Sequence, residues 1–181
     1  MDAVRETQMR MIEKSVAALR KEFGESVLGV ETFRDQTSVV LDRAALVPAC
    51  TLLRDDGELR FNRLSALTAV DYWPKEPRFV VVYQLYSIPN RSYLGLRVPL
   101  HGQSAELLTL EAVFPSANWP EREVYDMFGI KFLGHSDLRR LLMPYDWQGH
   151  PLRKDYPLGY EEVQFSFNHD EIDRKKPYAR E

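Results

Sequence analysis

Three apolar runs in the middle of the chain constrain its fold most strongly. LSALTAVDYW (64–73), RFVVVYQLYSI (78–88) and YLGLRVPL (93–100) are rich in aromatic and β-branched residues, which favour strands. The breaks between these runs contain prolines and Asn90, as turns require. The sequence therefore predicts three successive β-strands.

The residues before these runs predict the remainder of an α+β domain. Apolar residues recur at helical spacing between 3 and 22, with charged residues between them. VLGVETF and TSVVLDR are short β-type runs on either side of a polar break, which predicts a hairpin. AALVPACTLLRDDG predicts a short helix, with Pro48 near its first turn. This order of elements predicts a mostly antiparallel sheet with helices on one face.

The character of the sequence changes at Gly129. A helix is predicted just before it, with Asn118 as the N-cap, Pro120 in the first turn and Glu121 completing a capping box. Beyond Gly129 only SDLRRLL has helical character, and prolines interrupt the rest. We therefore divide the chain into an α+β domain (1–129), an extended segment that lies along its own domain or a partner (130–160) and a C-terminal tail (161–181).

The composition argues against several classes of function. A formal net charge of −3 offers no basic face for sequence-independent binding of nucleic acid. Cys50 is the only cysteine, which excludes an internal disulfide, a Cys₄ iron–sulfur cluster and a Cys-x-x-Cys redox pair, and its apolar neighbours predict a buried thiol. Gly-x-Gly and Gly-Lys-[Ser/Thr] motifs are both absent. We therefore expect this chain to bind no redox cofactor or nucleotide of its own.

The hydropathy pattern argues against insertion in a membrane. No stretch approaches the roughly 20 consecutive apolar residues that a membrane helix requires. The N-terminal residues carry charges throughout and lack the apolar core of a signal peptide. We expect a cytoplasmic chain that reaches a membrane only through a partner.

The carboxylates of the stretch between Glu121 and Pro157 raise the question of catalysis. Glu121 and Glu123 lie two residues apart on a predicted helix and so point in different directions, which favours helix-start carboxylates over an acid–base pair. Asp126 could serve as a general base, although an ion pair with Arg122 or with Arg139–Arg140 is the favoured interpretation.

The histidines of this stretch match no common pattern of metal ligands. His135 and Asp137 are better explained as local caps of SDLRRLL, and a third strong ligand beside His150 is not evident. A free-standing acid–base or metal-dependent enzyme stays as a distant alternative, with candidate residues Glu123, Asp126, His135 and His150.

Arginines and aromatic residues alternate along the same stretch, as they do in protein interfaces. Trp147 and Tyr156 lie in proline-bounded segments without periodicity, where a partner could cover them. Acidic and basic residues balance one another, which suits ion pairs with protein better than attraction of a phosphate. The stretch therefore indicates a docking surface.

The stretch ANWPEREVYDMFGIKFLGHSDLRRLLMPYDWQGHPLRKDYPLGY closely resembles the signature of the C-subunit family of bacterial respiratory complex I, the proton-translocating NADH:quinone oxidoreductase (NDH-1). The family pattern runs Glu-Arg-Glu, Asp-x-x-Gly, Phe, His-x-Asp-x-Arg-Arg and Pro-x-Arg-Lys-Asp-x-Pro. Here it falls on Glu121, Arg122, Glu123, Asp126, Gly129, Phe132, His135, Asp137, Arg139, Arg140, Pro151, Arg153, Lys154, Asp155 and Pro157.

The resemblance implies a scaffold subunit without catalytic residues, on the cytoplasmic side of the bacterial membrane. Companion subunits would hold FMN and the iron–sulfur clusters that carry electrons from NADH to quinone. This chain would support the D-subunit of the complex and the neighbouring cluster-bearing subunits, with Trp147 and Tyr156 added to the signature residues as contacts. The homologous subunit of a membrane-bound hydrogenase, a photosynthetic NDH-1 or an F₄₂₀H₂ dehydrogenase is the alternative.

Overall fold

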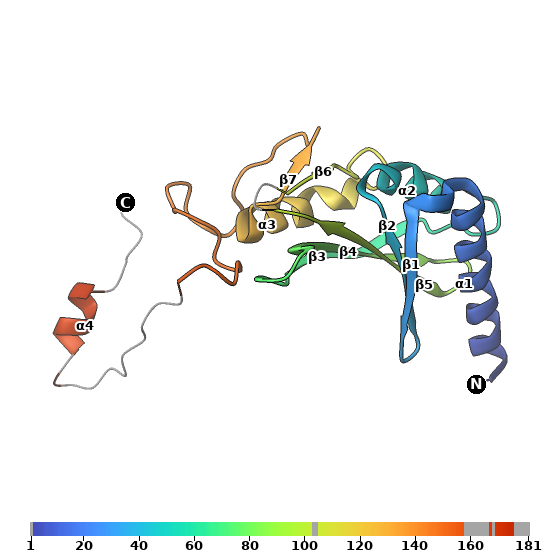
Figure 1. Cartoon of the computed structure of the whole chain (residues 1–181), viewed down its shortest axis with the longest axis horizontal. Coiled ribbons are helices and arrows are strands. Elements are labelled where there is room, and N and C mark those ends of the chain that lie inside the picture. Colours follow the sequence, from blue (N-terminus) through green and yellow to red (C-terminus); the bar gives the residue numbers. More distant parts are fainter. Residues whose placement is uncertain (1, 103–104, 158–166, 168, 176–181) are drawn as a thin grey trace.

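A five-stranded sheet forms the body of the chain, and Figure 1 shows helices above it. The computed structural model describes residues 2–102, 105–157, 167 and 169–175. The strands follow one another across the sheet in the order β1 (Val27–Phe33), β2 (Gln36–Leu41), β5 (Ser92–Leu100), β4 (Phe79–Ser87) and β3 (Arg63–Asp71).

The sheet is mostly antiparallel, which confirms the predicted fold class. β1 pairs with β2, β3 with β4, and β4 with β5 in antiparallel fashion. β2 and β5 are parallel, with Val39 opposite Leu96. The sequence did not predict this parallel pair, because it joins strands that are separated by a helix and two other strands.

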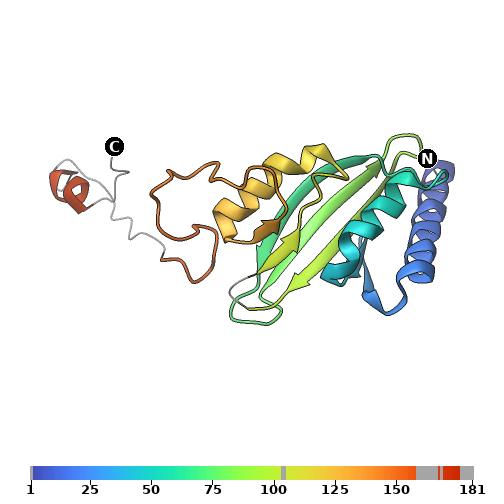
Figure 2. The same cartoon turned by 90° about the horizontal axis from the view of Figure 1, so that it is seen from above.

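Helices α2 and α3 lie over one face of the sheet, as Figure 2 shows. No helix in the described part of the chain is long and apolar enough to cross a membrane. The predicted tail (161–181) lies largely outside the described residues, apart from α4. The helices are α1 (Asp2–Phe23), α2 (Leu46–Asp55), α3 (Asn118–Phe128) and α4 (His169–Lys175), and 3₁₀ turns span Gly24–Ser26, Arg43–Ala45 and Pro115–Ala117.

The core lies between the sheet and the helices. Alternate residues of β4 and β5 point into it, and each large aliphatic side chain that is fully buried contributes about 1.5–3 kcal/mol. Cys50 of α2 is completely buried, as predicted, and burial raises the pKa of its thiol. The core also includes Leu19, Val39, Leu41, Leu46, Leu53, Phe61, Phe79, Val81, Tyr83, Leu85, Leu94, Leu96, Val98, Val124 and Phe128.

The start of α3 differs from the predicted cap. A 3₁₀ turn runs directly into the helix, so Asn118 already has helical dihedrals and its side chain does not cap the helix. The Asn118 amide donates instead to Glu111. Glu121 forms no capping box, because its carboxylate is buried and accepts hydrogen bonds from Thr109 and Leu110.

SDLRRLL forms no helix, contrary to the prediction. Backbone N–H groups in this stretch donate to the side chain of Asp126, which lies on α3, and are therefore unavailable for helical hydrogen bonds. A small parallel sheet of β6 (Glu106–Leu108) and β7 (Lys131–Leu133) precedes the stretch. β7 connects α3 to the irregular chain that follows.

We expect Tyr83→Phe to leave the protein as stable or to stabilise it. Tyr83 is fully buried, and its hydroxyl has no hydrogen-bond partner in the described structure. An unpartnered buried polar group costs about 1–3 kcal/mol, and phenylalanine keeps the ring that packs in the core. Urea unfolding should show an equal or larger free energy of unfolding for Tyr83→Phe. A loss of more than about 1 kcal/mol would mean that the hydroxyl has a stabilising partner.

Candidate functional site

The signature residues gather around α3 and residues 134–157, which we call the clamped segment. The described structure has no helix or strand within this segment. Its position is therefore set by side-chain and backbone hydrogen bonds to the rest of the domain. These bonds fall into four groups: at the middle of α3, at its C-terminal end, at the edge of the main sheet and at the beginning of the segment.

The carboxylate of Asp126 makes the densest set of these bonds. Asp126 is fully buried on α3. One of its oxygens, Oδ2, accepts from three successive backbone N–H groups, and the other accepts from a guanidinium. The donors are Leu141 at 3.0 Å, Leu142 at 2.7 Å, Met143 at 2.8 Å and Nη1 of Arg140 at 2.7 Å.

Electrostatics keep this carboxyl ionised. Burial raises the pKa of Asp126, but the bonds from Met143, Arg140 and the two neighbouring N–H groups outweigh burial and leave the pKa below its usual value. Arg140 also donates from Nη2 to the carbonyls of Trp147 at 2.8 Å and Gly149 at 3.1 Å. One ion pair therefore fixes both sides of the loop between 140 and 149.

The C-terminal carbonyls of α3 are covered by the clamped segment. The last carbonyls of a helix lack partners within the helix. Nδ1 of His150 must donate to its carbonyl, because a carbonyl can only accept, and burial lowers the pKa of this imidazole. The pairs are His150 Nδ1 with the Asp126 carbonyl at 2.9 Å, the Leu152 N–H with the Met127 carbonyl at 3.0 Å, and Arg153 Nε with the Phe128 carbonyl.

Gly129 is required at this point for two reasons. Its φ of 74° lies in the left-handed region, where a side chain is strained. A Cβ at this position would also lie 2.5 Å from the His150 ring and from Nη2 of Arg153. The predicted end of the helix at Gly129 is confirmed, and the glycine also lets the clamped segment pack against the helix end.

The far end of the clamped segment is tied to the edge of the sheet. Arg78 is 2% exposed and bridges Asp71 at 3.0 Å and Asp155 at 2.6 Å. The Lys154 N–H donates to Asp71 at 2.9 Å. Burial raises the pKa of Asp71, but Arg78 and the backbone donors outweigh it and lower the pKa. Arg78 and Asp71 were not predicted as site residues, although a charged residue at the end of an apolar strand was the available signal.

Polar contacts also hold the beginning of the segment. Glu111, which was not predicted to take part either, accepts from Ser136 at 2.7 Å (Oγ) and 2.9 Å (N–H). These bonds lower the pKa of Glu111 to about 2. His135 accepts from the Asp137 N–H at 3.0 Å through Nδ1, so its Nε2 donates to the Asn118 carbonyl at 3.0 Å.

The remaining signature residues divide between the clamp and the surface. Arg122 donates to the carbonyls of Arg139 and Arg140 at 3.2 and 3.3 Å. Asp137 pairs with Arg139 at 2.6 Å near the surface. Half-buried residues are Trp147, Pro151 and Tyr156, and exposed residues are Glu123, Lys154 and Pro157.

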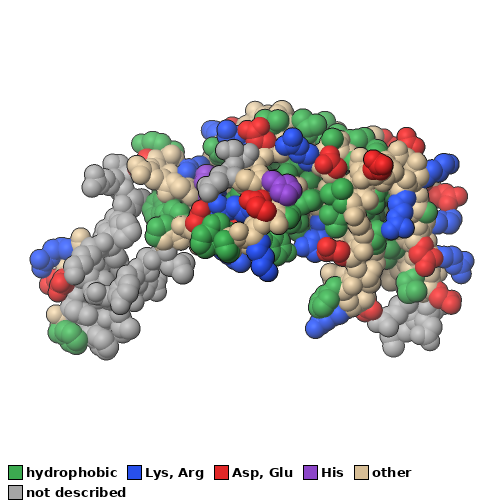
Figure 3. Space-filling view, viewed as in Figure 1, with side chains coloured by type: hydrophobic (Ala, Val, Ile, Leu, Met, Phe, Trp, Pro, Cys, Tyr) green, Lys and Arg blue, Asp and Glu red, His purple; other side chains and the backbone are tan. Residues whose placement is uncertain are grey.

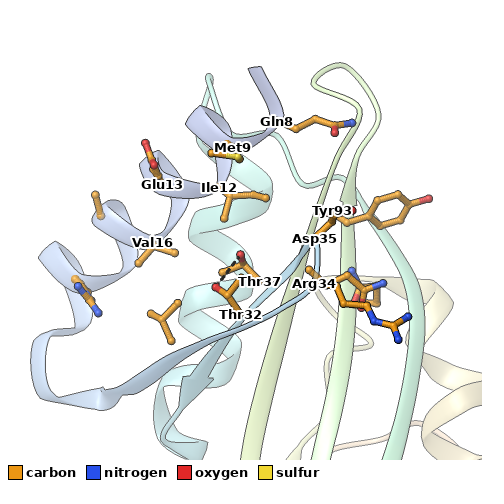
Figure 4. A pocket seen from close by; sticks show the side chains of 15 residues that line it. Gln8, Met9, Ile12, Glu13, Val16, Thr32, Arg34, Asp35, Thr37 and Tyr93 are labelled. Carbon is orange, nitrogen blue, oxygen red and sulfur yellow. Dashed lines mark hydrogen bonds between the residues drawn. The ribbon is translucent and has the colours of Figure 1, made fainter. Parts of the chain in front are cut away.

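The described structure accounts for the strongest acid–base candidate of the signature, Asp126, by bonds within the chain. Asp126 has four donors and no access to solvent. Among the described residues, no group of three or more His, Cys, Asp or Glu could hold a metal ion. A cleft of about 1080 Å³ lies elsewhere, between Met9, Ile12 and Val16 of α1 and the β1–β2 hairpin, and none of the signature residues lines it (Figure 4).

The clamped segment turns apolar side chains outward. Leu142, Tyr145 and Leu152 are 61%, 94% and 54% exposed. Figure 3 shows hydrophobic side chains over the end of the molecule where this segment lies. Two of the three residues belong to the clamp through their backbone N–H groups, so the surface is held in a defined position.

Comparison with known proteins identifies the family of this chain. The family model described as respiratory-chain NADH dehydrogenase, 30 Kd subunit, matches residues 39–162, which include α3 and the clamped segment. The NADH-quinone oxidoreductase C-subunit of Roseiflexus sp. (strain RS-1) is 50% identical over 163 residues, covering 90% of this chain and 94% of that protein. The protein of the same name from Geotalea uraniireducens is 47% identical over 145 residues, covering 80% and 87%.

Two solved structures are similar to the fold. A trypsin-resistant fragment of Nqo5 gives a TM-score of 0.55 at 31% identity and covers 73% of this chain and 99% of that one. A chain of a membrane-bound sulfane sulfur reductase, an archaeal respiratory membrane complex, gives 0.65 at 18% identity, covering 93% and 95%. The second likeness concerns the fold alone.

We expect Asp126→Asn to release the clamped segment. The amide offers one acceptor oxygen in place of two and leaves Arg140 without its counter-charge, which costs about 3–5 kcal/mol for a buried pair. Hydrogen exchange should show faster exchange at Leu141, Leu142 and Met143. Asp137→Asn is the control, because its ion pair with Arg139 is near the surface, where solvent screens it. Equal protection of the three amides in Asp126→Asn and the unchanged protein would contradict the clamp.

Glu121→Gln should change how stability depends on pH. Burial raises the pKa of Glu121, and the bonds from Thr109 and Leu110 oppose this only in part. A carboxyl with a raised folded-state pKa destabilises the fold as pH rises above its unfolded value of about 4.3. Relative to the unchanged protein, Glu121→Gln should therefore gain stability between about pH 4 and pH 7. Urea titrations at several pH values measure the difference, and a constant difference would contradict the raised pKa.

Proposed function

Because this chain belongs to the 30 kDa subunit family of respiratory-chain NADH dehydrogenase, we propose that it is a non-catalytic scaffold subunit of a bacterial NADH:quinone oxidoreductase. In this role it binds no cofactor, and companion subunits hold the FMN and iron–sulfur clusters that carry electrons from NADH to quinone. It lies on the cytoplasmic side of the membrane as a peripheral subunit. Its chemical contribution is to hold its neighbours in position.

The carboxylates of the signature support a structural role. Asp126, Glu121 and Asp155 each accept hydrogen bonds from this chain's own side chains or backbone. A general base must instead be free to reach a proton on its substrate. Of the carboxylates that suggested catalysis, Asp126 holds the clamped segment and Glu121 is bonded to Thr109 and Leu110.

The observation that carries the proposal is the outward set of Leu142, Tyr145 and Leu152 on a segment that hydrogen bonds to the rest of the domain hold in place. Exposed apolar residues that are held in place suit docking, because little conformational entropy is lost when a partner covers them. We propose that these three side chains are covered by a companion subunit, chiefly the D-subunit of the complex. Arg139 and Lys154, which are exposed, lie at the rim of this contact.

Other residues of the signature position the clamped segment instead of contacting a partner. Arg140 and Arg153 bond within the chain, so we assign them to positioning of the segment. Trp147 and Tyr156 are half-buried and support the loop: a Cβ on Gly149 would lie 2.7 Å from the Tyr156 ring. We therefore propose a docking surface on the same stretch as the one proposed from sequence, with the three exposed residues as its anchors in place of Trp147 and Tyr156.

Tyr145→Asp and Leu142→Asp should weaken incorporation into the complex without destabilising the chain. An interface hot spot contributes about 2 kcal/mol, or roughly 30-fold in affinity. We expect affinity-purified complex to contain at least about tenfold less of each variant, while the unfolding temperature of the isolated full chain stays unchanged. Met9→Asp is the matched control, with 60% exposure on α1 at the other end of the molecule (Figure 1).

Arg140→Ala and Arg153→Ala test the positioning of the clamped segment, separately from the docking surface. Each should lower both the incorporation and the stability of the chain, since each removes a bond of the clamp. Full assembly and unchanged NADH:quinone activity with Tyr145→Asp and Leu142→Asp combined would remove the support for docking at this surface.

A further inference from the structure

His150 lies where the clamped segment meets the C-terminal end of α3. Its side chain is half-buried, and its Nδ1 donates to the Asp126 carbonyl at 2.9 Å. A neutral imidazole carries one N–H group, and the contact with a carbonyl assigns that hydrogen to Nδ1. Nε2 is therefore the ring nitrogen that takes up a proton when the imidazole becomes charged.

The surroundings of Nε2 are unfavourable for a positive charge. A Cβ on Gly129 would lie 2.5 Å from Nε2 of His150 and 2.5 Å from Nη2 of Arg153. The two nitrogens are therefore no more than twice that distance apart. A proton on Nε2 would place a second cation beside the guanidinium, where like charges repel and partial burial weakens the screening by water.

The other groups that face the ring do not offset this repulsion. From the clamped segment, Arg140 donates to two carbonyls of the loop that leads into His150. From α3, the Tyr125 ring meets the imidazole edge-on, with 6.2 Å between the ring centroids. The Asp126 carboxylate is the nearby negative charge, and it already accepts from Arg140 and three backbone N–H groups.

The closed segment therefore disfavours the protonated ring. Burial is the largest cause that lowers the pKa of His150, and Arg153 and Arg140 lower it further, while Asp126 opposes them only in part. When the segment opens, the ring enters water and takes its ordinary pKa of about 6.5. The open form thus binds the proton more readily. The contribution of the neutral ring is fully present above that pH and is lost as the pH falls.

We propose that His150 is a pH-sensitive latch, whose neutral ring holds residues 140–153 against α3 and whose protonation at Nε2 releases them. Release removes the defined position of the outward side chains of Leu142, Tyr145 and Leu152. The consequence for docking rests on the proposed function, whereas the latch itself is a property of the isolated chain.

Hydrogen exchange in the isolated full chain tests the latch. The Leu152 N–H donates to the Met127 carbonyl, so its exchange rate relative to the intrinsic rate at the same pH reports opening of the segment. One pH unit below the ordinary pKa, about nine-tenths of the open-state imidazoles are protonated, which limits the effect to about tenfold. We expect protection at Leu152 to fall about three- to tenfold between about pH 7.5 and about pH 5.5.

Two glutamine variants assign the effect to one ring. His150→Gln keeps an N–H donor for the Asp126 carbonyl but takes up no proton, so protection at Leu152 should change less than about twofold between the two pH values. His135→Gln is the matched control. His135 lies in the same segment and also donates to a carbonyl, that of Asn118, and its variant should keep the full pH dependence at Leu152.

Glu121 cannot imitate the latch, although it is also buried. Its pKa is raised, so its ionisation destabilises the fold as the pH rises, which is the opposite direction.

An NMR titration of the His150 ring in the unchanged chain gives a second test that does not depend on the folding of a variant. The pKa should lie below about 6.5. A pKa at or above that value overturns the latch. Equal protection of Leu152 at both pH values, or a pH dependence that persists in His150→Gln, overturns it as well.

The latch and the proposed docking fail separately. Full incorporation of Tyr145→Asp into the complex would remove the docking surface and leave the latch of the isolated chain in place. A pH-independent segment would remove the latch and leave the docking surface.

Discussion

The clamped segment depends on one buried carboxylate. Asp126 is fully buried and ionised, and a charge in that position is tolerated only when donors surround it. Three successive N–H groups and Arg140 provide them, so the chain from 140 to 143 must pass close to α3. Arg140 in turn donates to the carbonyls of residues 147 and 149. The last carbonyls of α3 accept hydrogen bonds from residues between 150 and 153. A segment without an apolar core of its own is thereby held in one conformation.

Most of the fold could be predicted from the sequence, because local patterns determine it. The helical spacing near the N-terminus, the apolar runs between 64 and 100, and Gly129 each gave an element or boundary that the structure contains. The parallel pairing of β2 with β5 could not be predicted, since it depends on which strands meet in space. The cap at Asn118 was wrong because the preceding 3₁₀ turn, which no local pattern indicated, moves the start of helical geometry upstream.

The sequence predicted where the site lies, but it predicted the contacts of the individual residues less well. Asp126 was expected to pair with an arginine of the same stretch, and its pairing with Arg140 confirms this. SDLRRLL has helical character in isolation, and only the carboxylate 15 residues upstream of Leu141 explains why it stays irregular. Arg78 and Asp71 lie far from the segment in sequence, so their contacts with Asp155 and Lys154 were invisible to local patterns. Long-range polar contacts are thus what the sequence alone could not supply.

The order in which the clamp can form follows from where its anchors lie. Asp126 is available only after α3 has formed, and Arg78 meets Asp71 only after β3 and β4 have paired. Residues 134–157 leave the ribosome after all of these anchors. A partner in the complex therefore meets the outward leucines and tyrosine in their final arrangement only on chains whose sheet is already complete. With the docking that we propose, folding of the sheet would thus come before assembly of the complex.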